Sequence, residues 1–170
     1  MGRRSTKKSD IFFEKFKLAI KLLQESLTPG SRQAIFIGDN LITWNKNLSF
    51  IREPFFVDLL HDENLSIVEK SNIWRTYILL YFAEKALKLE GDYLELGCYV
   101  GTTADILLKK YDLNQYNKKY YLYDAFEWKD GCEHDEMPEH KDPRMYENVL
   151  RRFSKNKNVE VVRGYVPDTF

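Results

Sequence analysis

Three features are missing from this sequence: an excess of one charge, a long apolar run and a cluster of cysteines. The 26 basic residues balance 26 acidic residues, which argues against a dedicated nucleic-acid binder with a basic face. No stretch reaches the roughly 18 uninterrupted apolar residues of a membrane-spanning helix. Arg75 and Glu84 closely flank the most apolar run, residues 77–83. We therefore expect a soluble protein with no nucleic-acid partner and no membrane anchor.

The two cysteines, Cys98 and Cys132, are too few and too isolated for a disulfide framework or a four-ligand zinc site. The N-terminus, MGRRSTKKSD, is basic but lacks the apolar segment of a secretory signal. We therefore expect a cytoplasmic protein with free thiols. Gly2 and Thr6 fit the N-myristoylation pattern formally, but we favour a solvated tail because so short a pattern matches by chance.

Apolar spacing predicts the elements of the first half of the chain. Residues recurring at three and four predict helices over 10–27 and 66–89, and a shorter helix begins near Pro54. Two apolar runs, 34–37 and 41–44, flank a Gly-Asp-Asn turn and predict a small hairpin. The helix over 66–89 is apolar on most of its circumference, so we expect it to be buried. Residues 1–65 are assigned to a helical extension or cap.

The period changes after Gly91. Short strands are predicted over 93–96, 120–123 and 159–162, with helices over 102–111 and 144–153 and a long acidic surface loop over 127–144. The connections suit parallel crossovers, so residues 66–170 are predicted to form an α/β domain, a Rossmann-like doubly wound parallel sheet in the order 3-2-1. A full domain of this kind has further strands. We therefore expect an N-terminal fragment, truncated after about three strands, marginally stable and inactive alone.

The segment 95–103, ELGCYVGTT, stands between the first strand and the first helix of this domain. Glycines at 97 and 101 allow a sharp turn close to a ligand, which the free N–H groups of the next helix would face. A dinucleotide enzyme needs Gly-x-Gly-x-x-Gly for its pyrophosphate, and this loop lacks the third glycine. The loop is therefore a candidate cofactor site, with plain strand-to-helix packing as the alternative.

Asp124 follows the second strand about 23 residues after Gly101, where a doubly wound fold places a carboxylate on two ribose hydroxyls. A carboxylate offers the acceptor pair that vicinal hydroxyls need. The alternative is an aspartate that caps a turn.

Three segments together resemble the macrocin O-methyltransferase group of class I S-adenosylmethionine-dependent methyltransferases: 94–97 (LELG), 123–127 (YDAFE) and 163–169 (RGYVPDT). The resemblance covers about residue 77 to the end of the chain. It implies that the first segment holds the methionine end of the cofactor, that Asp124 lies near ribose and that the third segment lies near adenine. Tyr99 stands where many members have glycine, and Cys98 and Ala125 are smaller departures. The expected cofactor contacts are Glu95, Gly97, Cys98, Tyr99, Gly101, Thr102, Asp124, Phe126 and Gly164.

No catalytic residue is identified with certainty in the sequence. His134 and His140 lie in an acidic loop, 132–140, which we interpret as a solvated lid and not as a metal site. The metal-binding aspartates of the related enzymes, where present, follow a fourth strand, so Mg²⁺ is expected only through a C-terminal half that this sequence lacks.

Two groups of side chains receive structural interpretations. Alternation along a strand predicts core packing for Tyr120, Tyr121 and Tyr123, whereas Phe126 and Trp128 are expected as exceptions that serve as a platform for adenine or the acceptor. Arg151 and Arg152 are expected as solvated charges on the exposed face of their helix.

The resemblance implies transfer of a methyl group to oxygen on a sugar or another small hydroxylated acceptor, and a homo-oligomer is compatible with it. In such chemistry the cofactor supplies the reactive group and the protein aligns the acceptor. The alternatives are a nicotinamide oxidoreductase, against which the missing third glycine counts, and a non-catalytic Rossmann-like module.

Overall fold

The structure is a computed structural model that describes residues 14–19, 21–22, 35–39, 41–44, 46–127 and 141–169. The chain divides into two units, Met1–Ser49 and Phe50–Phe170. Residues 50–65, which the sequence analysis grouped with the N-terminal extension, belong to the second unit. The role of the first unit as an extension or cap stays a prediction.

The first unit contains a helix and a hairpin. Residues 14–19 and 21–22 are helical, within the range predicted. Strand β1 (Ile35–Gly38) pairs antiparallel with β2 (Leu41–Trp44), with Gly38 opposite Leu41. Asp39 in the connecting turn has a left-handed φ of 51°, which aspartate tolerates in two-residue hairpin turns. The predicted hairpin is confirmed.

The second unit begins with helices. The short 3-10 helix η1 (Ser49–Arg52) starts at the junction of the two units, and α2 (Pro54–His61), α3 (Ile67–Ser71) and α4 (Ile73–Ala86) follow. The predicted start at Pro54 is confirmed, but the single helix predicted over 66–89 is wrong. Asn72 has φ −78° and ψ 10° and serves as both the C-cap of α3 and the N-cap of α4. Apolar spacing continues across Asn72 and therefore does not reveal the break between α3 and α4.

Helix α4 is buried along one side only. Ile73, Leu80 and Ala83 are buried, whereas Tyr81 and Phe82 are 52 % and 65 % exposed. The helix that was expected to be buried is therefore buried on one side in the part of the chain that the structure describes. Among those residues no helix is long and apolar enough to cross a membrane.

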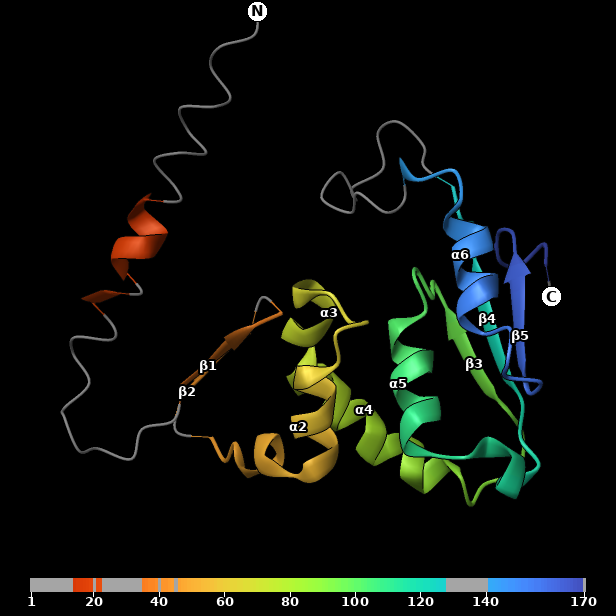
Figure 1. Cartoon of the computed structure of the whole chain (residues 1–170), viewed down its shortest axis with the longest axis horizontal. Helices are drawn as coiled ribbons and strands as arrows, with labels where there is room; N and C mark the ends of the chain where they lie inside the picture. Colours follow the sequence, from red (N-terminus) through yellow and green to blue (C-terminus); the bar gives the residue numbers. More distant parts are fainter. Residues whose placement is uncertain are drawn as a thin grey trace, which may run out of the picture. The chain divides into compact units, whose positions relative to one another are not determined.

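The sheet consists of three parallel strands in the order β3-β4-β5: β3 (Tyr93–Leu96), β4 (Tyr120–Asp124) and β5 (Val159–Arg163). Helix α5 (Thr102–Lys110) and the 3-10 helix η2 (Leu113–Tyr116) connect β3 to β4, and α6 (Met145–Arg152) precedes β5. Figure 1 shows α5 and α6 beside the sheet. An α/β fold with a parallel sheet is confirmed.

One face of the sheet forms the core. Tyr120 and Leu122 are buried there, as are Ile106 and Leu107 of α5. The other face is apolar and accessible, because Leu94 and Leu96 of β3 are each 53 % exposed. Since the carboxyl ends of parallel strands meet at one edge of the sheet, the loops after β3, β4 and β5 are brought together there.

Candidate functional site at the carboxyl edge of the sheet

Every second residue from 97 to 101 in the loop after β3 has a left-handed backbone conformation. Gly97, Tyr99 and Gly101 have φ values of 77°, 53° and 77°. A side chain in this region costs roughly 1–2 kcal/mol, so tyrosine is a disfavoured residue at position 99. At Gly101 an added Cβ would lie 2.6 Å from Cε2 of Phe153. The Phe153 ring therefore leaves no room for a side chain at position 101.

Asp124 connects the loop 95–103 to the segments 123–127 and 163–169. Its Oδ2 accepts a hydrogen bond from the N–H of Tyr99 at 2.7 Å, and its Oδ1 accepts one from the N–H of Phe126 at 2.9 Å. Its carbonyl accepts the N–H of Gly164 at 2.9 Å. Next to it, the Tyr123 carbonyl accepts the N–H groups of Gly97 and Cys98. The predicted loop and the predicted carboxylate are thus in direct contact.

Glu95 is a buried acid beside this junction. Its Oε2 accepts a hydrogen bond from the Tyr120 hydroxyl at 3.0 Å. Burial raises the pKa of Glu95 to about 6, and the charge of Asp124 adds to the effect, although hydrogen bonds from Tyr120 and Thr103 oppose it. At neutral pH the site therefore holds two neighbouring carboxylates, one of which is costly to keep ionised.

Cys98 is buried, 3 % exposed, and is a free cysteine. Burial raises the pKa of its thiol, and the charges of Asp124 and Glu95 raise it further. A neutral buried thiol is a poor nucleophile. Cys98 therefore contributes packing and its backbone N–H to the loop.

Phe126 does not present its ring as an open platform. It is 6 % exposed and its ring centroid lies 5.1 Å from that of Tyr146 on α6. Phe126 packs in the core against α6, so it is not the open platform that was expected. Its contact with a cofactor stays a prediction.

The segment after β5 folds back on itself next to Asp124. Gly164 has φ 148°, and the methyl group of Thr169 occupies the place where a Cβ of residue 164 would lie. The Thr169 hydroxyl donates to the Tyr165 carbonyl at 3.2 Å, and the Tyr165 hydroxyl donates to Glu127. A glycine at 164 is therefore required by the turn itself, whatever its part in binding.

Arg152 is not the solvated charge that the sequence analysis expected. Its Nη1 donates to Glu69 Oε1 at 3.0 Å and to the carbonyl of Val100 at 3.1 Å, and its Nη2 donates to Asp105 Oδ2 at 2.8 Å. Arg151 is exposed, as expected. One signal was available, because Arg152 continues the buried stripe of Met145 and Val149 at helical spacing.

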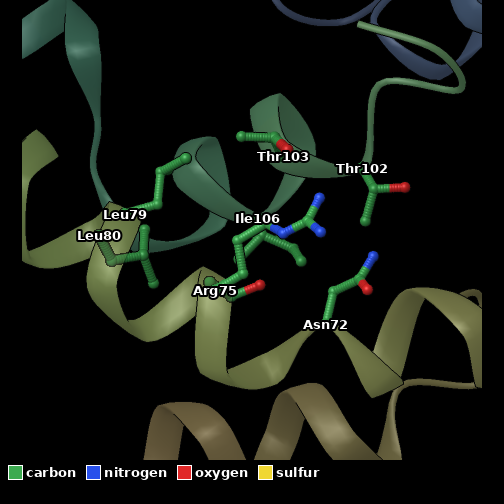
Figure 2. Close-up of a pocket in the computed structure, with 8 residues that line it drawn as sticks. Asn72, Arg75, Leu79, Leu80, Thr102, Thr103 and Ile106 are labelled. Carbon is green, nitrogen blue, oxygen red and sulfur yellow. The ribbon is translucent and has the colours of Figure 1, made fainter. Parts of the chain in front are cut away.

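A small pocket lies between α4 and the start of α5. Figure 2 shows Asn72, the N-cap of α4, and Arg75 of α4 directed toward Thr102 and Thr103 of α5. Its volume is about 40 Å³, which suits a few water molecules and not a nucleoside. The residues that line it are Asn72, Arg75, Thr76, Leu79, Leu80, Thr102, Thr103 and Ile106.

Several predicted residues lie outside the described part of the chain: Trp128, Cys132, His134 and His140. Within the described ranges, no group of three or more His, Cys, Asp or Glu residues is placed to hold a metal ion. The lid and its histidines stay predictions.

Comparison with known proteins leaves the site to be interpreted from its own geometry. No protein-family model matches this sequence, and a search of curated proteins finds no match.

Proposed function

We propose that the carboxyl edge of β3, β4 and β5 binds S-adenosylmethionine, and that the protein is a class I methyltransferase of the macrocin O-methyltransferase type with a Rossmann-like sheet. The methionine end would lie against residues 95–102, the ribose against Asp124 and the adenine near residues 163–169. The acceptor would be a sugar or another small hydroxylated molecule.

The observation that carries the proposal is the hydrogen bond from the Tyr99 N–H to the Asp124 carboxylate, 2.7 Å long. A pyrophosphate needs free loop N–H groups and positive potential. Here a carboxylate already occupies one such N–H, and Glu95 adds a second negative charge nearby. This environment favours a ligand with a positive charge, such as a sulfonium with its ammonium group, over an anionic dinucleotide.

The donor and acceptor chemistry also fits the ribose. A carboxylate has about four acceptor positions, and backbone N–H groups use one on each oxygen of Asp124. Each oxygen therefore retains an acceptor position for one of two vicinal hydroxyls. Because both oxygens are fixed by the backbone, the carboxylate is oriented before the ligand arrives, which lowers the entropic cost of binding.

S-Adenosylmethionine, when bound, supplies a methyl group that is already activated on sulfur, so the protein needs little side-chain chemistry of its own. Glu95 and Asp124 would attract the cationic end and orient the nucleoside, and the tightly hydrogen-bonded loop would fix the distance to the acceptor. An oxygen acceptor gains from a general base. His134 and His140 are our candidates for that role.

Titration calorimetry with S-adenosylhomocysteine and with NAD tests this proposal. We expect the wild-type chain to bind S-adenosylhomocysteine and not NAD. Asp124→Asn should weaken binding about tenfold or more, because the amide offers one acceptor oxygen in place of two. Glu160→Gln, an exposed acid on β5, is the matched control and should bind like the wild type. Equal binding of NAD, or no binding of S-adenosylhomocysteine, would contradict the proposal.

A further inference from the structure

We infer that Glu69 of α3 together with Arg152 and Phe153 at the end of α6 form a clamp that sets the shape of the loop 97–101 for its ligand. These three residues, called the loop clamp below, are positioning residues, since they act on the loop and not on the ligand. The inference rests on the proposed function, because it concerns the affinity of the same site.

Helix α6 contacts the loop through two adjacent residues of different kinds. Arg152 donates to the Val100 carbonyl at 3.1 Å, which fixes the peptide that precedes Gly101. Phe153 is 5 % exposed, and its ring fills the space where a Cβ of Gly101 would lie. A polar and an aromatic contact therefore hold the end of the loop from the same side.

Helix α3 contacts the residue that follows the loop. The Thr102 hydroxyl donates to Glu69 Oε1 at 2.5 Å, and the same oxygen accepts the Arg152 guanidinium at 3.0 Å. Burial alone would raise the pKa of Glu69, but hydrogen bonds from Thr102, Ser66 and Arg152 outweigh it and lower the pKa. Glu69 is therefore ionised at neutral pH, and it links α3, α5 and α6 at the point where the loop enters α5.

The first part of the loop is held by β4, because the N–H groups of Gly97 and Cys98 donate to the Tyr123 carbonyl and that of Tyr99 donates to Asp124. The loop clamp supports its other end, at Val100 and Gly101. Inside the loop, the Gly101 N–H bonds to the Cys98 carbonyl at 2.8 Å, while Tyr99 is held in a left-handed conformation that L residues disfavour. Strained backbone persists only where its surroundings determine it. Glu69 and Arg152 lie 83 positions apart in sequence, so this support exists only when α3 and α6 have docked around α5.

The test compares two neighbouring arginines. Arg152→Lys keeps the charge but replaces the planar fork that serves Glu69, Asp105 and Val100 at once. Arg151→Lys makes the same chemical change on the exposed face of α6. Glu69→Gln is a second variant. It keeps the capping box of α3, because glutamine also serves there, yet it removes the ion pair with Arg152.

Binding of S-adenosylhomocysteine is measured by calorimetry at a temperature where circular dichroism shows every variant folded. Hydrogen exchange at residues 98–102 is measured on the ligand-free proteins. We expect Arg152→Lys and Glu69→Gln to raise Kd about tenfold and to speed exchange in the loop, but not in β4. Arg151→Lys should change neither. A merely structural role would lower the melting temperature and leave Kd and local exchange unchanged.

The outcomes separate this inference from the proposed function. If the wild type binds S-adenosylhomocysteine, and both clamp variants bind as tightly as Arg151→Lys, the loop clamp is overturned while the proposed function stands. Should the wild type not bind, the proposed function and the loop clamp fall together. If Arg152→Lys does not fold, Glu69→Gln alone tests the loop clamp. Binding as tight as that of Arg151→Lys overturns the loop clamp, and weaker binding with faster loop exchange supports it.

Discussion

The two ends of the three-stranded sheet are held by different kinds of side-chain contact. At the amino end, the buried ammonium of Lys118 donates to the carbonyls of Leu89 and Gly91, both at 2.6 Å. The Tyr93 hydroxyl donates to the Ala83 carbonyl at 2.6 Å. These contacts join the end of α4 to the start of the sheet. They satisfy backbone carbonyls, and the acids beside them, Glu90 and Asp92, are exposed.

At the carboxyl end, by contrast, two acids lie close together, and side chains of α3 and the end of α6 hold the loop 97–101. Asp124 is fixed by N–H groups of the loops that follow β3 and β4, and Glu95 is kept in an environment that raises its pKa to about 6. Stability alone does not require this arrangement. The contacts at the amino end hold α4 to the sheet, and the two acids at the carboxyl end are the reason we propose a ligand there.

The largest expected effect contrasts two left-handed glycines, Gly101 at the carboxyl end and Gly91 at the amino end. An added Cβ meets the Phe153 ring at 2.6 Å in the first case and nothing within 4 Å in the second. Gly101→Ala should cost about 4 kcal/mol of unfolding free energy, from backbone strain and overpacking. Gly91→Ala should cost about 1 kcal/mol, from strain alone. Urea denaturation measures both, and equal costs would contradict the contrast.

The next effect concerns Lys118, which is 7 % exposed. Lys118→Met should lower the free energy of unfolding by about 3 kcal/mol, because two hydrogen bonds from a charged group to carbonyls are lost. Lys119→Met, its exposed neighbour, should change stability by less than about 0.5 kcal/mol. Once folded, both variants should bind S-adenosylhomocysteine like the wild type. Weaker binding by Lys118→Met would contradict the claim that the amino end of the sheet takes no part in binding.

The smallest effect, and the only stabilising one, is expected for Glu95→Gln. The folded-state pKa of about 6 lies above the ordinary glutamate pKa of 4.5, so the folded state binds this proton more tightly than the unfolded state does. The contribution of protonated Glu95 to the free energy of unfolding is complete below pH 4.5 and is lost as the pH rises through about 6. Above pH 6 the ionised Glu95 costs up to about 2 kcal/mol.

Glutamine should remove that cost, so Glu95→Gln should be more stable than the wild type at pH 8 and equally stable at pH 4. Thermal denaturation at the two pH values checks the sign. The same variant should bind S-adenosylhomocysteine less tightly, because a negative charge near its α-ammonium group is lost. A variant less stable than the wild type at pH 8 would show that the ionised Glu95 is not penalised.

Local sequence signals were sufficient for most elements of the fold. Strand β3 and the start of α5 follow from the glycines at 91, 97 and 101, and β4 and β5 follow from short apolar runs of their own. The meeting of the loop with Asp124 also followed from the rule that parallel strands bring their carboxyl ends together. These predictions depended on spacing along the chain, which the sequence displays directly.

The features that were missed depend on partners distant in sequence. The ion pair of Arg152 with Glu69 spans 83 positions, and no periodicity in α6 identifies that partner. Phe126 is buried beside Tyr146 of α6, a contact that composition does not reveal. The break at Asn72 arises from cap geometry within an otherwise helical pattern.

The most direct test of the central claim follows backbone amide signals by nuclear magnetic resonance while the protein is titrated with S-adenosylhomocysteine. The site at the carboxyl edge predicts that the amides of Tyr99, Phe126 and Gly164, which all bond to Asp124, shift together with one saturation curve. The amides of Gly91 and Lys118 should stay in place. Shifts confined to the amino end of the sheet, or no shifts at a saturating concentration, would contradict the account.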